Sequence, residues 1–144
     1  MSPRFAEIAF TSSVKAAQLH YGTRHNNERY EQSGDRRDVL TPREVEFLEQ
    51  SDSFYQATVA DNGWPYVQHR GGPRGFLRVL DERTIGFADF RGNLQYISVG
   101  NLGADDRISM ILMDYPNQRR LKILGRARVV DEAQDPQLVA SLKV

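Results

Sequence analysis

The chain has 144 residues, close to the size of one domain, and its 19 basic and 19 acidic residues cancel, which argues against a general nucleic-acid binder or a polybasic membrane protein. Because it has no cysteine and only three scattered histidines, disulfide scaffolds, iron–sulfur clusters and thiol catalysis are excluded and no metal site is expected. No apolar run approaches the ~18 residues of a membrane span and the N-terminus lacks the apolar core of a signal peptide, so we expect a soluble, cytoplasmic protein.

The first 40 residues are expected to be a polar, helical lead-in. Ser12 and Ser13 before the stretch 14–19 predict a short capped helix, which Gly22 closes. Nearly every residue from 23 to 38 is polar or charged, and this composition predicts a loop.

A second helix is predicted to begin at Thr41. Thr41 is a cap, Pro42 stands where its missing N–H costs nothing, and Glu44 completes a capping box. The apolar side of this helix is short, and the helix is expected to end near Ser51.

From residue 53 onward, aromatic and β-branched residues predict strands. Asp61-Asn62-Gly63 predicts a hairpin turn, because Asn and Gly accept the positive φ that such a turn needs. In the last strand apolar residues alternate mostly with basic ones, so one face is expected to be core and the other cationic. About six strands with short connections predict an antiparallel barrel or a sandwich. The predicted elements are strands at 54–60, 64–70, 76–80, 84–90, 108–113 (apolar on both faces) and 121–130, with helices at 94–102 and from Asp135 onward.

Three segments carry the residues best suited to bind a ligand. In the first, Gln68, His69 and Arg70 lie on a strand beside two glycines that would let a ligand approach, although a bulge with solvent-facing polar residues fits too. In residues 89–96 a strand gives way to a helix, whose N-terminus favours anions, but an ordinary capped connection has the same pattern. Residues 119–122 bring basic side chains into a strand, as a charged edge strand also does.

In chain order, these motifs together resemble one family. Over residues 41–135 the chain resembles the pyridoxamine 5′-phosphate oxidase-related, FMN-binding split-barrel proteins, in a branch other than the vitamin-pathway oxidase itself. The segments that carry the resemblance are Asn62–Tyr66, Arg70 with the glycines after it, Phe87–Asn93, Ala104–Leu112 and Arg119–Ala127.

The resemblance implies a mainly β (α+β) domain, a six-stranded antiparallel split barrel of Greek-key topology with flanking helices. This domain would occupy residues 41–135, between the lead-in at 1–40 and the start of a C-terminal helix at 136–144. It further implies a homodimer with one FMN per subunit at the interface, acting on a small-molecule substrate or NAD(P)H.

The resemblance also implies which residues bind the cofactor. Arg70 is the expected partner of the FMN phosphate, and Arg120 or Lys122 would place positive charge near the flavin ring. The leading hypothesis is an FMN-dependent oxidoreductase, in which the flavin carries the electron chemistry and no protein nucleophile is required, so no catalytic residue is assigned. A non-catalytic flavin-, haem- or deazaflavin-binding module, or a sensor on the same barrel, remains the alternative. The residues implied to bind the cofactor are Gln68, His69, Arg70, Gly71, Asp89, Asn93, Gln95, Arg120 and Lys122.

Overall fold

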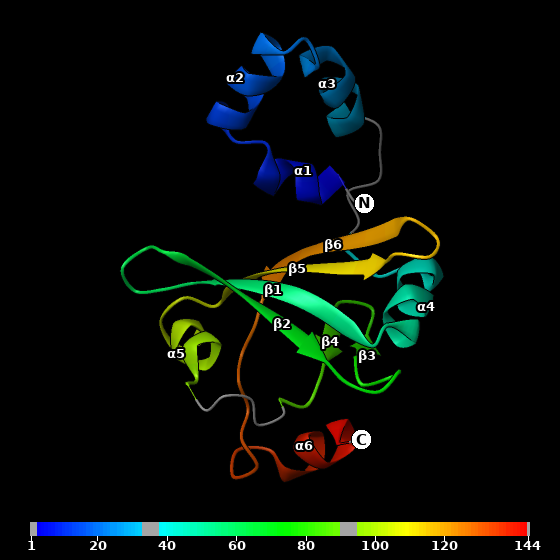
Figure 1. The fold of residues 1–144 in the computed structure, drawn as a ribbon, viewed down its shortest axis with the longest axis vertical. Helices are drawn as coiled ribbons and strands as arrows, with labels where there is room; N and C mark the ends of the chain where they lie inside the picture. Colours follow the sequence, from blue (N-terminus) through cyan, green and yellow to red (C-terminus); the bar gives the residue numbers. More distant parts are fainter. Residues whose placement is uncertain (1–2, 33–37, 90–94, 144) are drawn as a thin grey trace. The chain divides into compact units, whose positions relative to one another are not determined.

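The computed structural model describes residues 3–32, 38–89 and 95–143 (Figure 1). The chain divides into two compact units, Met1–Val39 and Leu40–Val144. None of the described helices combines the length and the apolar character that crossing a bilayer requires.

The first unit contains three helices: α1 (Pro3–Ala9), α2 (Ser12–His20) and α3 (Arg24–Gln32). The predicted helix α2 forms, but its cap is Thr11, whose hydroxyl accepts a hydrogen bond of 3.3 Å from the Val14 amide.

Helix α3 occupies a segment predicted as a loop, so that prediction is wrong. Its polar residues include good helix formers, and Arg24 and Glu31, two turns apart, form an ion pair. Arg24 also donates a hydrogen bond to Gln18 of α2, and the Tyr30 ring lies 6.2 Å from that of Phe10. Contacts between side chains therefore stabilise a helix that buries no residue of its own.

The second unit begins with α4 (Pro42–Gln50), where the predicted capping box forms between Thr41 and Glu44. The predicted hairpin turn also forms, with Gly63 at φ 85°. All six predicted strands are present, although β3, β4 and β6 are shorter than predicted, and residue 90, the predicted end of the fourth strand, lies outside the described residues. The remaining elements are β1 (Ser53–Val59), β2 (Pro65–Gly71), β3 (Arg78–Asp81), β4 (Thr84–Gly86), α5 (Ile97–Ala104), β5 (Arg107–Asp114), β6 (Arg119–Arg126) and α6 (Pro136–Leu142).

The strands form two antiparallel sheets, one of four strands in the order β2-β1-β5-β6 and one that pairs β3 with β4. The antiparallel α+β architecture is thus confirmed, whereas the ladders of the described residues do not close six strands into one barrel. The glycine-rich segment between β2 and β3 connects the two sheets through a turn. Gly75 adopts a φ of 84°, and Phe76 N donates to Pro73 O in a tight turn at 2.9 Å.

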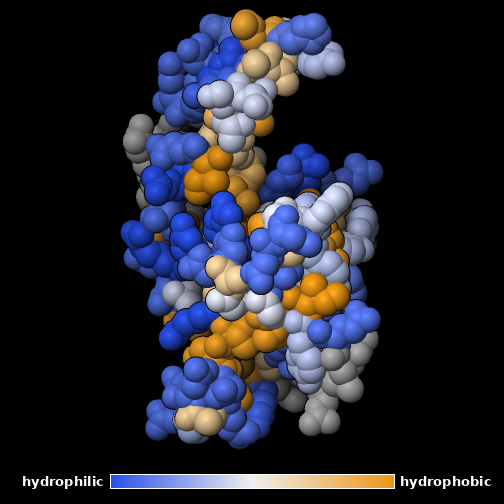
Figure 2. Space-filling view, turned by 90° about the vertical axis from the view of Figure 1, so that its left-hand side faces the viewer, coloured by the Kyte–Doolittle hydropathy of each residue, from blue (hydrophilic) through white to orange (hydrophobic). Residues whose placement is uncertain are grey.

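The core lies on one face of the four-stranded sheet, which we call the inward face. It is the face of Phe54 and Leu112, both fully buried, and the Phe76 ring stacks on Phe54 at 5.9 Å. Strand β5, predicted to be apolar on both sides, is fully buried only on this face, because Ile111 and Met113 opposite are half-buried. Elsewhere, polar side chains cover much of the surface seen in Figure 2.

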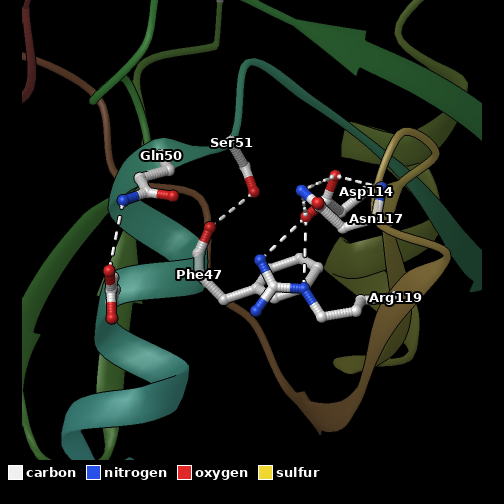
Figure 3. A network of polar contacts seen from close by, with 7 residues as sticks. Phe47, Gln50, Ser51, Asp114, Asn117 and Arg119 are labelled. Carbon is white, nitrogen blue, oxygen red and sulfur yellow. Dashed lines mark hydrogen bonds and ion pairs between the residues drawn. The ribbon is translucent and has the colours of Figure 1, made fainter.

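Figure 3 shows the end of α4 beside the β5–β6 hairpin, where Arg119 lies next to Phe47. Asp114 accepts hydrogen bonds from Asn117 Nδ2 at 3.0 Å and from Arg119 Nη2 at 2.8 Å, and these contacts lower the pKa of its carboxyl group. The Arg119 guanidinium lies 5.7 Å from the centre of the Phe47 ring, a cation–π contact. Arg119, one of the basic residues singled out in the sequence, therefore has a structural role.

Candidate functional site

The alternation of β2 separates the predicted site residues onto two faces. Gln68 and Arg70 pair with the buried Gln56 and Phe54 of β1, so their side chains lie on the inward face. His69 pairs with Tyr55, which is 40% exposed, on the opposite, outward face. Successive side chains of a strand point to opposite faces, so these three neighbours cannot line one side of the sheet.

Arg70 forms an ion pair with Asp89, between Nη1 and Oδ1. The Arg70 side chain is 15% exposed and that of Asp89 is 39% exposed, so the arginine is the more buried partner. Within the described residues, the Nε atom of Arg70 is buried and has no acceptor. A buried charged donor without an acceptor is costly in a folded protein, and a bound water, ion or ligand would satisfy it.

Gln68 belongs to a group of buried or half-buried polar side chains between the sheet and α5, which we call the polar seam. Ser98 donates a hydrogen bond to Gln68 Oε1 at 2.7 Å, and Asn101 donates one to Thr58 Oγ1 at 3.0 Å. Its members are Gln56, Thr58, Gln68, Ser98 and Asn101.

Ser98 and Asn101 were not among the site residues predicted from the sequence. They stand three residues apart in a helix that is otherwise rich in Gly and apolar residues, which places them on one face. That spacing was the available signal, because polar residues at i and i+3 in a short apolar helix indicate a polar partner.

The outward face holds three of the predicted residues, His69, Arg120 and Lys122. One row across the sheet runs from His69 through Tyr55 and Ile111 to Lys122, with the His69 and Tyr55 rings 5.1 Å apart. Arg120 lies two residues from Lys122 on this face, and neither cation has an ion-pair partner within the described part of the chain.

Tyr55 has a further neighbour beyond this row. Its hydrogen bond with Tyr115 raises the pKa of the Tyr115 hydroxyl. Tyr115 is 67% exposed, so this pair extends the aromatic surface of the outward face toward the β5–β6 turn.

The remaining predicted residues are Gly71, Gln95 and Asn93. Gly71 ends β2, and a Cβ there would meet Asp52 O at an ordinary 3.5 Å, whereas one on Gly72 would lie 2.7 Å from the Phe76 ring. Of the two glycines, Gly72 is therefore the one that requires the absence of a side chain, because the Phe76 ring packs closely against it. Gln95 is exposed and lies just before α5, and Asn93 is outside the described residues.

Two comparisons with known proteins gave matches. The family model described as pyridoxamine 5′-phosphate oxidase matches residues 40–143. A crystal structure of a tagged histidine-to-alanine variant of HupZ from group A Streptococcus is 17% identical, with a TM-score of 0.47 over 60% of this chain and 67% of that chain. No curated protein matches the chain. Since the family model spans both sheets and α4 to α6, the chain belongs to the pyridoxamine 5′-phosphate oxidase family.

Proposed function

We propose that this protein binds FMN and acts as a flavin-dependent oxidoreductase on a small-molecule substrate. Proteins of its family generally bind flavin. The observation that carries the proposal is Arg70, a largely buried cation at the end of β2, next to the glycine pair 71–72, whose Nε has no acceptor among the residues that the structure describes.

The residues of the inward face fit the chemical needs of the cofactor. A flavin needs donors and acceptors for its polar ring edge, an apolar surface for the ring and positive charge for its phosphate. Arg70 and Asp89 offer charged groups, Gln68 offers an amide, and the half-buried Phe87, whose ring centre lies 5.1 Å from that of the fully buried Phe54, offers an apolar surface. When bound, FMN supplies the electron-transfer chemistry, so these residues need only bind and orient it.

We infer that the active form is a homodimer with the cofactor at the interface. Proteins of this family are commonly dimeric. The outward face has apolar side chains in need of cover, including Val67, which is 63% exposed, and the half-buried Ile111 and Leu124. In this arrangement the two sheets of one subunit would act as the two halves of a split barrel.

A titration of the flavin-free protein with FMN, followed by flavin fluorescence, tests the proposal. We expect a yellow, saturable complex that sediments as a dimer, and a higher thermal midpoint with increasing FMN. A protein that binds no FMN would contradict the binding proposal. A monomer that holds FMN at full occupancy would contradict the shared site.

Turnover with NADH or NADPH separates an enzyme from a non-catalytic carrier. One feature of the inward face favours the carrier. His69, the histidine nearest to Arg70 in the sequence, lies on the opposite face of the sheet, where it cannot act as an acid or base beside Arg70. A bound flavin that either nucleotide reduces, and that oxygen or an added acceptor reoxidises, supports the oxidoreductase. A bound flavin that stays oxidised with both supports the carrier.

A further inference from the structure

Arg70 and Asp89 form a unit in which the charges cancel. Their contact uses one guanidinium nitrogen, Nη1, and one carboxylate oxygen, Oδ1. Guanidinium carries five N–H donors, and within the described residues Asp89 is the only partner of Arg70. The second carboxylate oxygen of Asp89 likewise has no donor there. The pair therefore keeps hydrogen-bond donors and an acceptor side by side.

A neutral pair of this kind suits a neutral ligand edge better than a phosphate. A phosphate near Arg70 would also face the carboxylate of Asp89, which already neutralises the guanidinium, and these two like charges would repel each other. A cyclic imide, by contrast, presents carbonyl acceptors beside an N–H donor, which is the complement of what the pair offers. The pyrimidine ring of a flavin has such an edge.

We propose that Arg70 and Asp89 together bind the pyrimidine edge of the flavin ring, and that the phosphate is bound elsewhere. In this arrangement a guanidinium N–H donates to a ring carbonyl, and Asp89 accepts from the ring N–H. The inference rests on the proposed binding of FMN and replaces the expectation that Arg70 pairs with the phosphate.

The surroundings of the pair support recognition of a ring. Arg70 lies opposite the fully buried Phe54 across the β1–β2 ladder, and Asp89 follows Phe87 by two residues. The rings of Phe54, Phe76 and Phe87 form a cluster with centres 5.1 to 6.4 Å apart, and Phe87 is its half-buried member, so it is the ring that a bound flavin would contact. Hydrogen bonds of the largely buried Arg70 are electrostatically stronger than hydrogen bonds in water.

Riboflavin has the same ring as FMN and lacks the phosphate, so comparing the two ligands tests the proposal. Dissociation constants for both are measured with the flavin-free wild type, Arg70→Ala and Asp89→Ala. We expect each variant to bind both flavins about 10- to 100-fold more weakly, with an unchanged ratio between the two constants. A variant that loses affinity for FMN alone would overturn the proposal.

Arg70→Lys provides a second test that does not depend on a truncated side chain. Lysine keeps the positive charge but not the planar set of donors, so it would retain binding of a phosphate and lose the paired contact with a ring edge. We expect Arg70→Lys to bind riboflavin as weakly as Arg70→Ala does, and full rescue of FMN binding by lysine would contradict the proposal.

The ion pair of Arg126 and Asp106 gives matched controls. Its residues are 20 positions apart in the sequence, whereas Arg70 and Asp89 are 19 apart, and both of its side chains are more exposed than those of Arg70 and Asp89. Arg126→Ala and Asp106→Ala should leave both dissociation constants unchanged, and an equal loss in these controls would refute a specific role for Arg70 and Asp89. A wild type that binds neither flavin would overturn the proposed function as well as this inference. A wild type that binds both, together with unaffected Arg70 and Asp89 variants, would overturn this inference alone.

Discussion

Replacing both members of the Arg70–Asp89 pair by apolar residues tests whether the pair is kept for binding or for stability. The side chains are 15% and 39% exposed, so the pair is partly removed from water. Replacement of a buried ion pair by apolar residues is often neutral or stabilising by about 1–4 kcal/mol, and the exposure of Asp89 places our expectation at about 0–2 kcal/mol. Arg70→Met with Asp89→Leu should therefore fold at least as stably as the wild type while losing flavin binding.

The two single variants should differ in a defined direction. Asp89→Leu leaves the more buried charge of Arg70 without its partner, and we expect a loss of about 1–3 kcal/mol. Arg70→Met leaves the more exposed carboxylate, which water can solvate, so its cost should stay below about 1 kcal/mol. Urea unfolding of the full chain, followed by circular dichroism, measures all three variants. A double variant less stable than both single variants would refute the reasoning, because the pair would then be a net source of stability.

Two further predictions concern glycine positions and acid stability. Gly72→Ala should destabilise the protein by about 1–3 kcal/mol, because the new Cβ would lie 2.7 Å from the Phe76 ring. Gly100→Ala is the control: Gly100 lies in α5, a Cβ there would have no atom within 4 Å, and the variant should be neutral or stabilising. Thermal melts measure both variants. Hydrogen bonds from Arg107 lower the pKa of Asp105 to about 2, below its unfolded value of about 3.9. Its stabilising effect should be complete above about pH 4 and lost as the pH falls through about 2, so Asp105→Asn should show a weaker dependence of the urea midpoint on pH in this range.

Local signals predicted the second unit well because its elements depend on neighbouring residues. The capping box of α4 needs Thr41 and Glu44 three positions apart, and the β1–β2 turn needs a residue such as Gly63 that accepts positive φ. Both requirements can be recognised from a few consecutive residues of the sequence. The apolar alternation of the last strand likewise identified the face on which Leu121 and Ile123 pack against the core.

The errors arise where contacts between distant residues decide the structure. The pair of Arg24 and Glu31 stabilises a helix in a stretch whose polarity indicated a loop. The pairing of Asp89 with Arg70, and the contact of Ser98 with Gln68 thirty residues earlier, depend on how the strands are arranged. The period of a strand does predict that His69 faces away from Gln68 and Arg70, but a list of family positions does not carry that information.

The position of β2 determines how these residues can meet at one ligand. Strand β2 is an outer strand of the four-stranded sheet, so a ligand along its edge can reach Arg70 on the inward face and His69 on the outward face. Arg120 and Lys122 lie on β6, the opposite outer strand, three strand spacings or about 14 Å from β2. For a ligand at the edge of β2, the most accessible Arg120 and Lys122 would be those of a second copy of the chain. Participation of Arg120 or Lys122 in cofactor binding therefore requires the dimer, whereas participation of Arg70 does not.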